Sequence, residues 1–181
     1  MAIKSNIALE NGENITVRSA TEQDAEKLLE FFCSVCSESV FLLSDGSETD
    51  YTVEQEKEFI TAHSESTQNF LILAEANGEI IGNCTFEQVS FLKRVKHRCT
   101  LGISVREKYQ GMGIGKILMC FAQDAAKQKG FEQIELEVIA NNQKAINLYD
   151  KLGFVKCGEI TDGIKYPDGS YENIIIMVKK L

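Results

Sequence analysis

The dipeptide Asn77-Gly78 constrains the fold of this chain more than any other short feature of its sequence. It separates two apolar runs, residues 70–76 and 79–86. A two-residue type I′ turn needs a positive φ angle at both central positions, and Asn followed by Gly supplies them. The sequence therefore predicts a tight β-hairpin, and with it a sheet that contains neighbouring antiparallel strands.

Hydrophobic periodicity and capping residues predict the remaining elements. Thr21 and Asp24 resemble a capping box that opens a helix, and a second helix is expected to begin near Thr52. The residues expected on the apolar face of the first helix are Ala25, Leu28, Leu29, Phe32 and Cys36. The other expected elements are strands at 15–18, 99–105 and 133–138, helices from about 113 and over 142–152, and a hairpin around Pro167. This order predicts an α/β fold with a mixed sheet and helices on both faces.

The length of 181 residues suits one domain, and no linker, repeat or low-complexity stretch divides the chain, so one domain is expected over residues 1–181. No apolar run suits a signal peptide or a membrane span, which predicts a cytoplasmic protein without a membrane partner. The cysteines are then expected to be reduced and to pack as small core residues; they are Cys33, Cys36, Cys84, Cys99, Cys120 and Cys157. Cys33-x-x-Cys36 has no second pair nearby, so core packing is favoured and no metal is expected.

Charge is distributed unevenly along the chain. The net charge of −8 argues against a nucleic-acid partner, which would favour a basic surface. Residues 38–58 carry seven carboxylates against one lysine, and residues 93–116 carry seven cations against one glutamate. The acidic segment suits a cation and the basic segment an anion, although a charge run often only solvates a surface. The basic segment differs because it flanks a glycine loop.

The glycine loop is Gly111-Met112-Gly113-Ile114-Gly115-Lys116. Glycines let the backbone approach a ligand closely, and unpaired N–H groups at the start of a helix attract an anion, so the loop suits a pyrophosphate. It is not a P-loop, because Ile117 stands where that motif has Ser or Thr. A dinucleotide-binding loop would have Gly-x-Gly-x-x-Gly directly after a strand, whereas five residues intervene here, although Glu137 lies about where a ribose-binding acid would. A glycine turn without a ligand is a third interpretation.

Three sequence blocks resemble the GNAT superfamily of N-acetyltransferases: Leu101-Gly102-Ile103-Ser104-Val105, then Gln110-Gly111-x-Gly113-x-Gly115, then Asn142-x-x-Ala145-x-x-Leu148-Tyr149-x-x-Leu152-Gly153-Phe154. With the Asn77-Gly78 hairpin they cover most of residues 70–160, while the N-terminal third matches only in its helix layout. The resemblance implies a single α/β domain with a mixed, mostly antiparallel central sheet flanked by helices. It also implies an acetyl-CoA-dependent enzyme that transfers an acetyl group to an amine.

The resemblance further implies where acetyl-CoA binds. The backbone of the central strand would contact the pantetheine arm and the acetyl carbonyl through Ile103, Ser104 and Val105. The loop would hold the pyrophosphate through Gln110, Gly111, Met112, Gly113, Ile114, Gly115 and Lys116. Asn142 matches an asparagine that contacts coenzyme A, and Tyr149 matches a tyrosine near its sulfur.

These roles are chemically reasonable. Backbone N–H groups stabilise the oxyanion formed when an amine attacks a thioester, and a phenol can protonate the departing thiolate. Two alternatives stay open: Asn142 as a plain helix cap, and Tyr149 as a core aromatic.

The general base is less well defined. Many members of the superfamily carry a glutamate just before the Leu-Gly of the central strand, where this chain has Thr100. Glu135 and Glu137 are two residues apart, so on a strand they point to the same face. His97 is a third candidate, because histidine in general titrates near neutral pH, although a lone histidine is more often structural. Any of the three could deprotonate the amine through water.

Two classes of function therefore compete: an enzyme that acetylates an amine directly, and a module that binds acyl-CoA without turnover, which the absent glutamate favours. A covalent acyl-enzyme is disfavoured because Cys99 and Cys120 have no paired base in sequence. The resemblance implies that residues 20–65 form the acceptor side and residues 97–155 the acetyl-CoA side. The acidic segment would then face the acceptor, which predicts a cationic amine of a small molecule or peptide. A homodimer is a further partner hypothesis.

Overall fold

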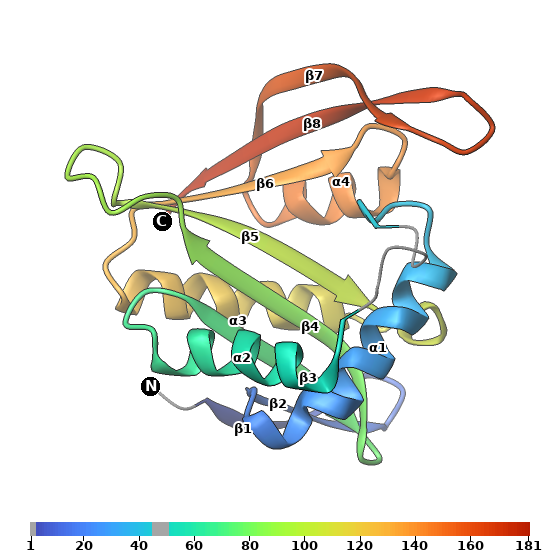
Figure 1. The fold of residues 1–181 in the computed structure, drawn as a ribbon, viewed down its shortest axis with the longest axis vertical. Helices are drawn as coiled ribbons and strands as arrows, with labels where there is room; N and C mark the ends of the chain where they lie inside the picture. The colour runs from blue at the N-terminus through green and yellow to red at the C-terminus, as the bar shows by residue number, and fades with distance from the viewer. Residues whose placement is uncertain (1–2, 45–50) are drawn as a thin grey trace.

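The hairpin expected at Asn77-Gly78 is present in the computed structural model, which describes residues 3–44 and 51–181 (Figure 1). Strands β3 (Phe70–Ala76) and β4 (Glu79–Gln88) pair antiparallel across this turn. Asn77 has a φ angle of 52° and Gly78 one of 80°, so both are positive, as a type I′ turn requires.

Eight strands form one sheet in the order β1-β2-β3-β4-β5-β6-β8-β7. Within the described chain, only β5 (Arg98–Val105) and β6 (Gln133–Ile139) pair in parallel. The other strands are β1 (Lys4–Ala8), β2 (Asn14–Ser19), β7 (Val155–Lys165) and β8 (Tyr171–Lys180). The sheet is therefore mixed and mostly antiparallel, as expected. Strand β1 was not predicted, because its sequence contains a single strong strand former, Ile7. The structure accordingly leaves its residues exposed or half-buried.

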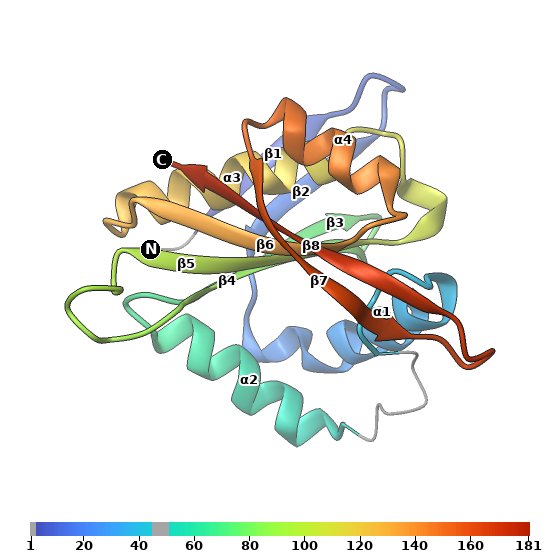
Figure 2. The same cartoon turned by 90° about the horizontal axis from the view of Figure 1, so that it is seen from above.

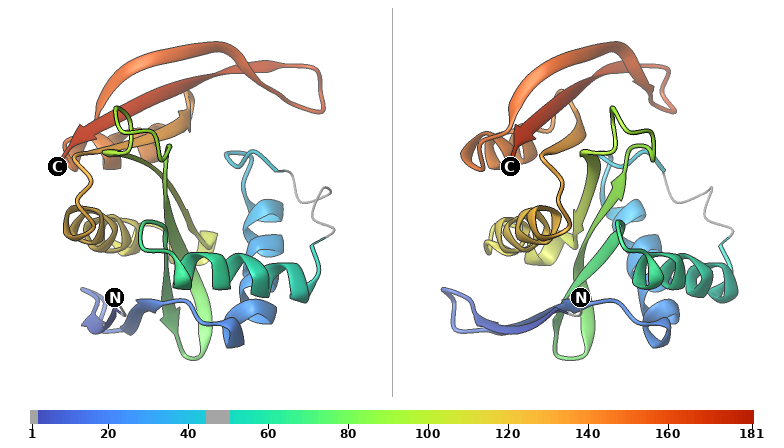
Figure 3. Two further views of the ribbon diagram at one scale, coloured as in Figure 1. Left: turned by 60° about the vertical axis from the view of Figure 1, so that its left-hand side comes forward. Right: turned by 90° about the vertical axis from the view of Figure 1, so that its left-hand side faces the viewer.

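Helices cover both faces of the sheet (Figures 2 and 3). Helices α1 (Ala25–Glu38) and α2 (Val53–Glu65) lie on one face, and α3 (Ile114–Gln128) and α4 (Gln143–Lys151) on the other. Short 3-10 turns, η1 (Glu22–Asp24) and η2 (Glu107–Tyr109), precede α1 and α3. Within residues 3–44 and 51–181, no helix combines the length and apolarity needed to cross a membrane.

The capping residues set where the N-terminal helices begin. The backbone N–H of Thr21 donates to Asp24 Oδ2 at 2.8 Å. The backbone N–H of Gln55 donates to the Thr52 hydroxyl at 3.2 Å, and the Gln55 side chain accepts from the Thr52 N–H. Both pairs satisfy N–H groups that a helix start would otherwise leave unpaired.

Two apolar clusters hold the layers together. The larger lies between the sheet and the α3–α4 layer and includes Ile72, Phe86, Leu101, Leu118 and Leu136. The smaller lies between the sheet and the α1–α2 layer and includes Leu28, Phe31, Ile60, Leu71 and Leu73. Burying one such side chain contributes about 1.5–3 kcal/mol, so these clusters dominate the stability of the fold.

Two packing predictions are wrong in detail. Helix α1 buries Phe31 and Val35, whereas Leu29 and Phe32 are only half-buried. Apolar residues at neighbouring positions create two overlapping stripes, and periodicity alone does not decide which of them faces the sheet. Cys36, Cys84 and Cys99 are buried as expected, but Cys33, Cys120 and Cys157 are exposed.

Candidate active site

The two parallel strands diverge and form a fork in the sheet. Strands β5 and β6 pair only at Arg98–Gln133, Cys99–Ile134 and Thr100–Glu135. Beyond Thr100, β5 stays paired with β4 as far as Val105, but its other edge has no partner strand among the described residues. Figure 1 shows β5 and β6 separating along their length. The backbone of Ile103, Ser104 and Val105 therefore lies along an opening, where unpaired N–H and C=O groups are available to a ligand.

The two faces of the sheet differ at the fork: one is apolar and the other is polar. Leu101 and Ile103 point into the cluster beneath α3, while Thr100, Gly102 and Ser104 alternate to the other face, where they are exposed or half-buried. We call this second side the open face. The register adds polar neighbours to it from β4 and β6, namely Asn83, Thr85, Glu87, Glu135 and Glu137.

The glycine loop lies next to the fork. Gly111 and Gly113 have φ angles of 81° and 83°, and a Cβ built on either would meet nothing within 4 Å. A Cβ on Gly115 would lie 3.3 Å from Leu148 Cδ2 and 3.9 Å from Ile103 Cδ1, so the start of α3 packs beside both β5 and α4. None of the backbone N–H groups of residues 111–116 donates a hydrogen bond to a described residue. The loop is thus an open cradle of donors at a helix start, which suits a pyrophosphate.

Gln110 and Asn142 are held by hydrogen bonds within the chain. The Gln110 Nε2 group donates to the Val105 carbonyl at 3.3 Å, which ties the loop to the end of β5. Asn142 Oδ1 accepts from the backbone N–H of Ala145 at 3.2 Å and so caps α4. The cap leaves the Asn142 amide nitrogen available to a ligand.

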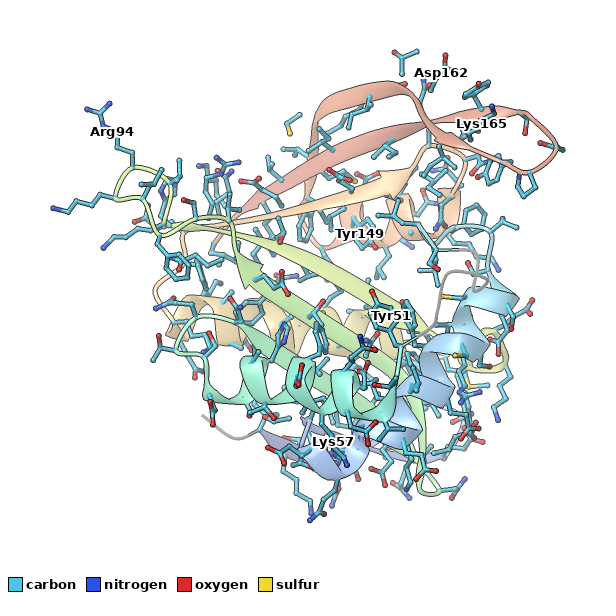
Figure 4. All side chains as sticks on the ribbon, viewed as in Figure 1. Tyr51, Lys57, Arg94, Tyr149, Asp162 and Lys165 are labelled. Carbon is cyan, nitrogen blue, oxygen red and sulfur yellow. The ribbon has the colours of Figure 1, made fainter. Side chains whose placement is uncertain are left out.

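Tyr149 projects from α4 toward the fork. Figure 4 shows it between the ribbons of β6 and β5. Only 7% of the residue is exposed, and its ring lies 5.9 Å from the ring of Phe154. Burial raises the pKa of the phenol well above its usual value, and the nearby Cys84 thiol adds to the shift. Tyr149 therefore keeps its proton at neutral pH, and it approaches the fork from the face opposite to Glu137.

Residues 36–154, well over half of the chain, match the family described as the Acetyltransferase (GNAT) family. The chain belongs to the GNAT family. A GNAT-family acetyltransferase from Streptococcus pneumoniae has the same fold, with a TM-score of 0.88 and 30% identity over 92% of this chain and 99% of that chain.

A further sequence relative and a further solved structure are similar to this GNAT chain. An N-alpha-acetyltransferase of Sulfurisphaera tokodaii is 32% identical over 106 residues, which cover 53% of this chain and 62% of that relative. The matched region thus spans less than two-thirds of this curated relative's length. The structure of yncA from Salmonella typhimurium with its cofactor acetyl-CoA shares the fold, at a TM-score of 0.80 and 19% identity over 92% of this chain and 94% of that chain.

Among the described residues, the register of β4, β5 and β6 places three carboxylates of the GNAT chain on the open face, and two of them are already engaged. Glu135 accepts hydrogen bonds from Arg98 and, at 2.7 Å, from Gln133 Nε2. The Arg98 guanidinium lowers the pKa of Glu135 below its usual value, with help from Gln133 and against the opposing effect of burial. Glu137 makes no ion pair or side-chain hydrogen bond with any residue described here, and it lies two positions beyond the last β5–β6 pair.

The third carboxylate, Glu87, was missed by sequence reasoning. It lies on β4 directly opposite Thr100, so a carboxylate is present one strand away from the position where many GNAT members carry theirs. His63 of α2 is only 4% exposed; its Nδ1 lies 2.9 Å from the Phe59 carbonyl and its Nε2 lies 3.1 Å from Glu87 Oε1. Both ring nitrogens of His63 therefore lie within hydrogen-bond distance of an oxygen, and the Glu87 side chain is tied to α2. No sequence signal links residues so far apart.

His97 lies away from the other candidates. It precedes β5, and its carbonyl accepts from the backbone N–H of Glu132 at 2.9 Å. Ile103 is six positions further along the chain, which is about 20 Å along a strand. His97 is therefore at the closed end of the fork, whereas Tyr149 and Glu137 flank its open part. Among the described residues, no group of three His, Cys, Asp or Glu side chains could hold a metal ion.

The charged residues of the acidic segment 38–58 and the basic segment 93–116 make different contacts in the structure. Glu38 accepts from the backbone N–H of Glu107 at 2.8 Å, and this bond, with the Ser34 hydroxyl, lowers the pKa of its carboxyl. Three other acids of the segment lie on α2 at Glu54, Glu56 and Glu58. The remaining three lie outside the described residues: Asp45, Glu48 and Asp50. In the basic segment, Arg98, Arg106 and Lys108 all bind carboxylates.

Proposed function

We propose that this chain is an acetyl-CoA-dependent N-acetyltransferase that transfers the acetyl group directly to a primary amine. The observation that carries the proposal is the fork between β5 and β6, whose open end lies beside the unpaired N–H groups of the glycine loop. Membership of the GNAT family and the acetyl-CoA described with yncA support this donor.

The residues present fit acetyl-CoA. The loop from Gln110 to Lys116 offers N–H donors and open space for the pyrophosphate, and Lys116 adds an exposed cation. The free edge of β5 at Ile103, Ser104 and Val105 offers hydrogen-bonding groups to an amide-containing arm, and the Asn142 amide lies at the start of α4. The thioester supplies the activated acyl group.

Proton movement is assigned to residues on opposite faces of the fork. The Glu137 carboxylate accepts a proton from the acceptor ammonium, directly or through one water, because it is the carboxylate of the open face without a partner among the described residues. The Tyr149 phenol holds its proton and donates it to the sulfur that leaves. Backbone N–H groups of β5 stabilise the negative charge that develops on the acyl oxygen.

We further propose that the acceptor is a cationic amine of a small molecule or a peptide. Support comes from the acidic segment: Glu54, Glu56 and Glu58 lie on α2, the helix that also carries His63 beside the open face. Opposite charge steers an acceptor toward such a surface.

A non-catalytic acyl-CoA-binding module is the alternative, and Thr100 at the position of the common glutamate is the observation in its favour. Release of free thiol from acetyl-CoA across a panel of polyamines, aminoglycosides, amino acids and N-terminal peptides separates the two functions. The enzyme releases thiol in step with one amine class and yields the acetylated amine in equal amount. Tight acetyl-CoA binding with no thiol release above background across the panel would favour the binding module.

A further inference from the structure

The loop between β4 and β5 carries an apolar tip that the proposed acetyl transfer does not use. Figures 1 and 2 show this loop, residues 89–97, projecting beyond the ends of its strands and away from the rest of the molecule. Phe91 is 86% exposed and Leu92 is 72% exposed. A single exposed apolar residue is ordinary, but two adjacent large ones on a projection indicate a contact surface.

Three cations follow the apolar pair directly. Lys93, Arg94 and Lys96 make no ion pair or side-chain hydrogen bond within residues 3–44 and 51–181. Figure 4 shows Arg94 pointing outward from the loop. The tip is therefore positively charged without compensation, although the chain as a whole has a net charge of −8.

The loop is held in shape by its own backbone. The N–H groups of Val95 and Lys96 both donate to the Leu92 carbonyl at 2.9 Å. Gln88 Nε2 donates to the Lys96 carbonyl at 2.9 Å, and the N–H of Val89 donates to the Arg98 carbonyl at 3.0 Å. These bonds close the turn, so the loop loses little conformational entropy when Phe91 binds a partner. The closed turn also presents no strand edge to which a peptide could add a strand.

From this combination we propose that residues 89–96, the Phe91 tip, dock the protein on an anionic lipid surface. Phe91 and Leu92 enter the boundary between headgroups and acyl chains, and Lys93, Arg94 and Lys96 lie against the headgroup phosphates. A convex tip suits a bilayer, which accommodates a projecting side chain without a preformed pocket. Such peripheral docking departs from the expectation of no membrane partner, because the exposure of Phe91 is a property of the fold and not of any long apolar run.

A tryptophan reporter tests the proposal, since the natural chain has no tryptophan. In the full chain carrying Phe91→Trp, vesicles of phosphatidylcholine with phosphatidylglycerol should shift the emission to shorter wavelength, and vesicles of phosphatidylcholine alone should not. Tyr171→Trp is the matched control, because Tyr171 is also exposed but lies at the start of β8, and its emission should not change.

Charge and apolar contributions are separated by further variants. Arg94→Gln in the Phe91→Trp background should weaken vesicle binding about fivefold, the usual contribution of one cation near an anionic surface. Lys57→Gln, on α2, should leave binding unchanged. Phe91→Asp should weaken cosedimentation with anionic vesicles by at least about tenfold, because it removes the aromatic side chain proposed to enter the bilayer. Its melting temperature and its thiol release with a soluble amine should match those of the natural chain, so a failure of docking and a failure of the enzyme are distinguishable.

Four results would overturn the proposal. The first is no emission shift with either kind of vesicle. An equal shift with neutral vesicles would remove the role of the cations. A shift with polyglutamate or RNA, but not with vesicles, would assign the tip to an acidic macromolecule. A shift that depends on protein concentration without vesicles would assign it to a second copy of the chain.

Discussion

Tyr149 is protonated at neutral pH, as a proton donor must be, because an ordinary phenol has a pKa of about 10. Burial raises the pKa of Tyr149 above that value, and the Cys84 thiol adds to the shift. Tyr149→Phe should lower the rate of the chemical step by about 10²–10⁴ while acetyl-CoA affinity stays the same, since the ring still packs against Phe154. Single-turnover kinetics and calorimetric titration measure the two quantities. An unaltered chemical step would reduce Tyr149 to packing.

Glu137 is tested through the pH dependence of its variant. Glu137→Gln should lower turnover at neutral pH by about 10²–10⁴, and the deficit should shrink as pH rises, because the acceptor amine then loses its proton to solvent. Glu87→Gln is the matched control, because Glu87 shares the open face but is bonded to His63. If the control lost more activity than Glu137→Gln, Glu87 would become the better candidate for the base.

The glycine loop can be tested against a second glycine of the same geometry. Gly113 and Gly169 have φ angles of 83° and 85°, and a Cβ on either meets nothing within 4 Å. Alanine at either position should cost about 1–2 kcal/mol of stability through backbone strain. Only Gly113→Ala should also weaken acetyl-CoA binding.

Thermal denaturation with added ligand measures the difference between these two variants. For the natural chain, acetyl-CoA at 100 times its dissociation constant should add about 2.7 kcal/mol of stability, and NAD should add none. Gly113→Ala should lose most of this gain and Gly169→Ala none of it. Stabilisation by NAD instead would favour the dinucleotide interpretation of the loop.

An ion-pair network links β2, η1 and β3. Arg18 Nη2 lies 2.6 Å from Asp24 Oδ1 and 2.7 Å from Glu75 Oε2. Burial acts to raise the pKa of Asp24, but hydrogen bonds from Arg18 and Thr21 outweigh it and lower the pKa below its usual value. A lowered carboxyl pKa contributes stability above the unfolded value of about 3.9, and this contribution is lost as pH falls through the folded value.

Replacement of Arg18 should therefore have a pH-dependent effect. Arg18→Met should lower the free energy of unfolding by about 3 kcal/mol at pH 7, because it leaves Asp24 charged and poorly compensated. The difference in unfolding free energy between the variant and the natural chain should narrow below about pH 4, where Asp24 of the variant takes up a proton. Urea denaturation at neutral and at acidic pH measures this difference. A difference of equal size at the two pH values would mean that lost packing, not charge, explains the effect.

The carboxylates of the acidic segment 38–58 are predicted to attract a cationic acceptor amine. Converting Asp45, Glu48 and Asp50 to amides should raise KM for a cationic amine and flatten its salt dependence, since screening acts beyond about 8 Å at physiological ionic strength. The rate at saturating amine should change little. Glu10, Glu13 and Glu26 are exposed acids outside the acidic segment, so their conversion to Gln is a control with the same net charge. Unchanged KM in the first variant would leave the acidic segment with a role in solubility alone.

Much of the architecture follows from local chemistry that a sequence displays. The Asn77-Gly78 turn, the caps at Thr21 and Thr52, and the glycine loop are each decided by the φ angles or hydrogen bonds of neighbouring residues, so their positions could be predicted. The resemblance to the GNAT superfamily supplied the rest of the fold class. The sequence also placed Tyr149 correctly on a helix, and burial as a core aromatic was one of the two interpretations it left open.

The remaining features depend on contacts between residues far apart in the chain, and no local pattern encodes them. Pairing of β5 with β6 ends at Thr100, and this creates the fork. Arg98 engages Glu135 and His63 engages Glu87, so Glu137 is distinguished from its neighbours only in three dimensions. The same holds for Phe91, whose exposure depends on where β4 and β5 end relative to the rest of the molecule. Turns and caps follow from the torsions of a few consecutive residues, whereas a site requires side chains that only tertiary packing brings together.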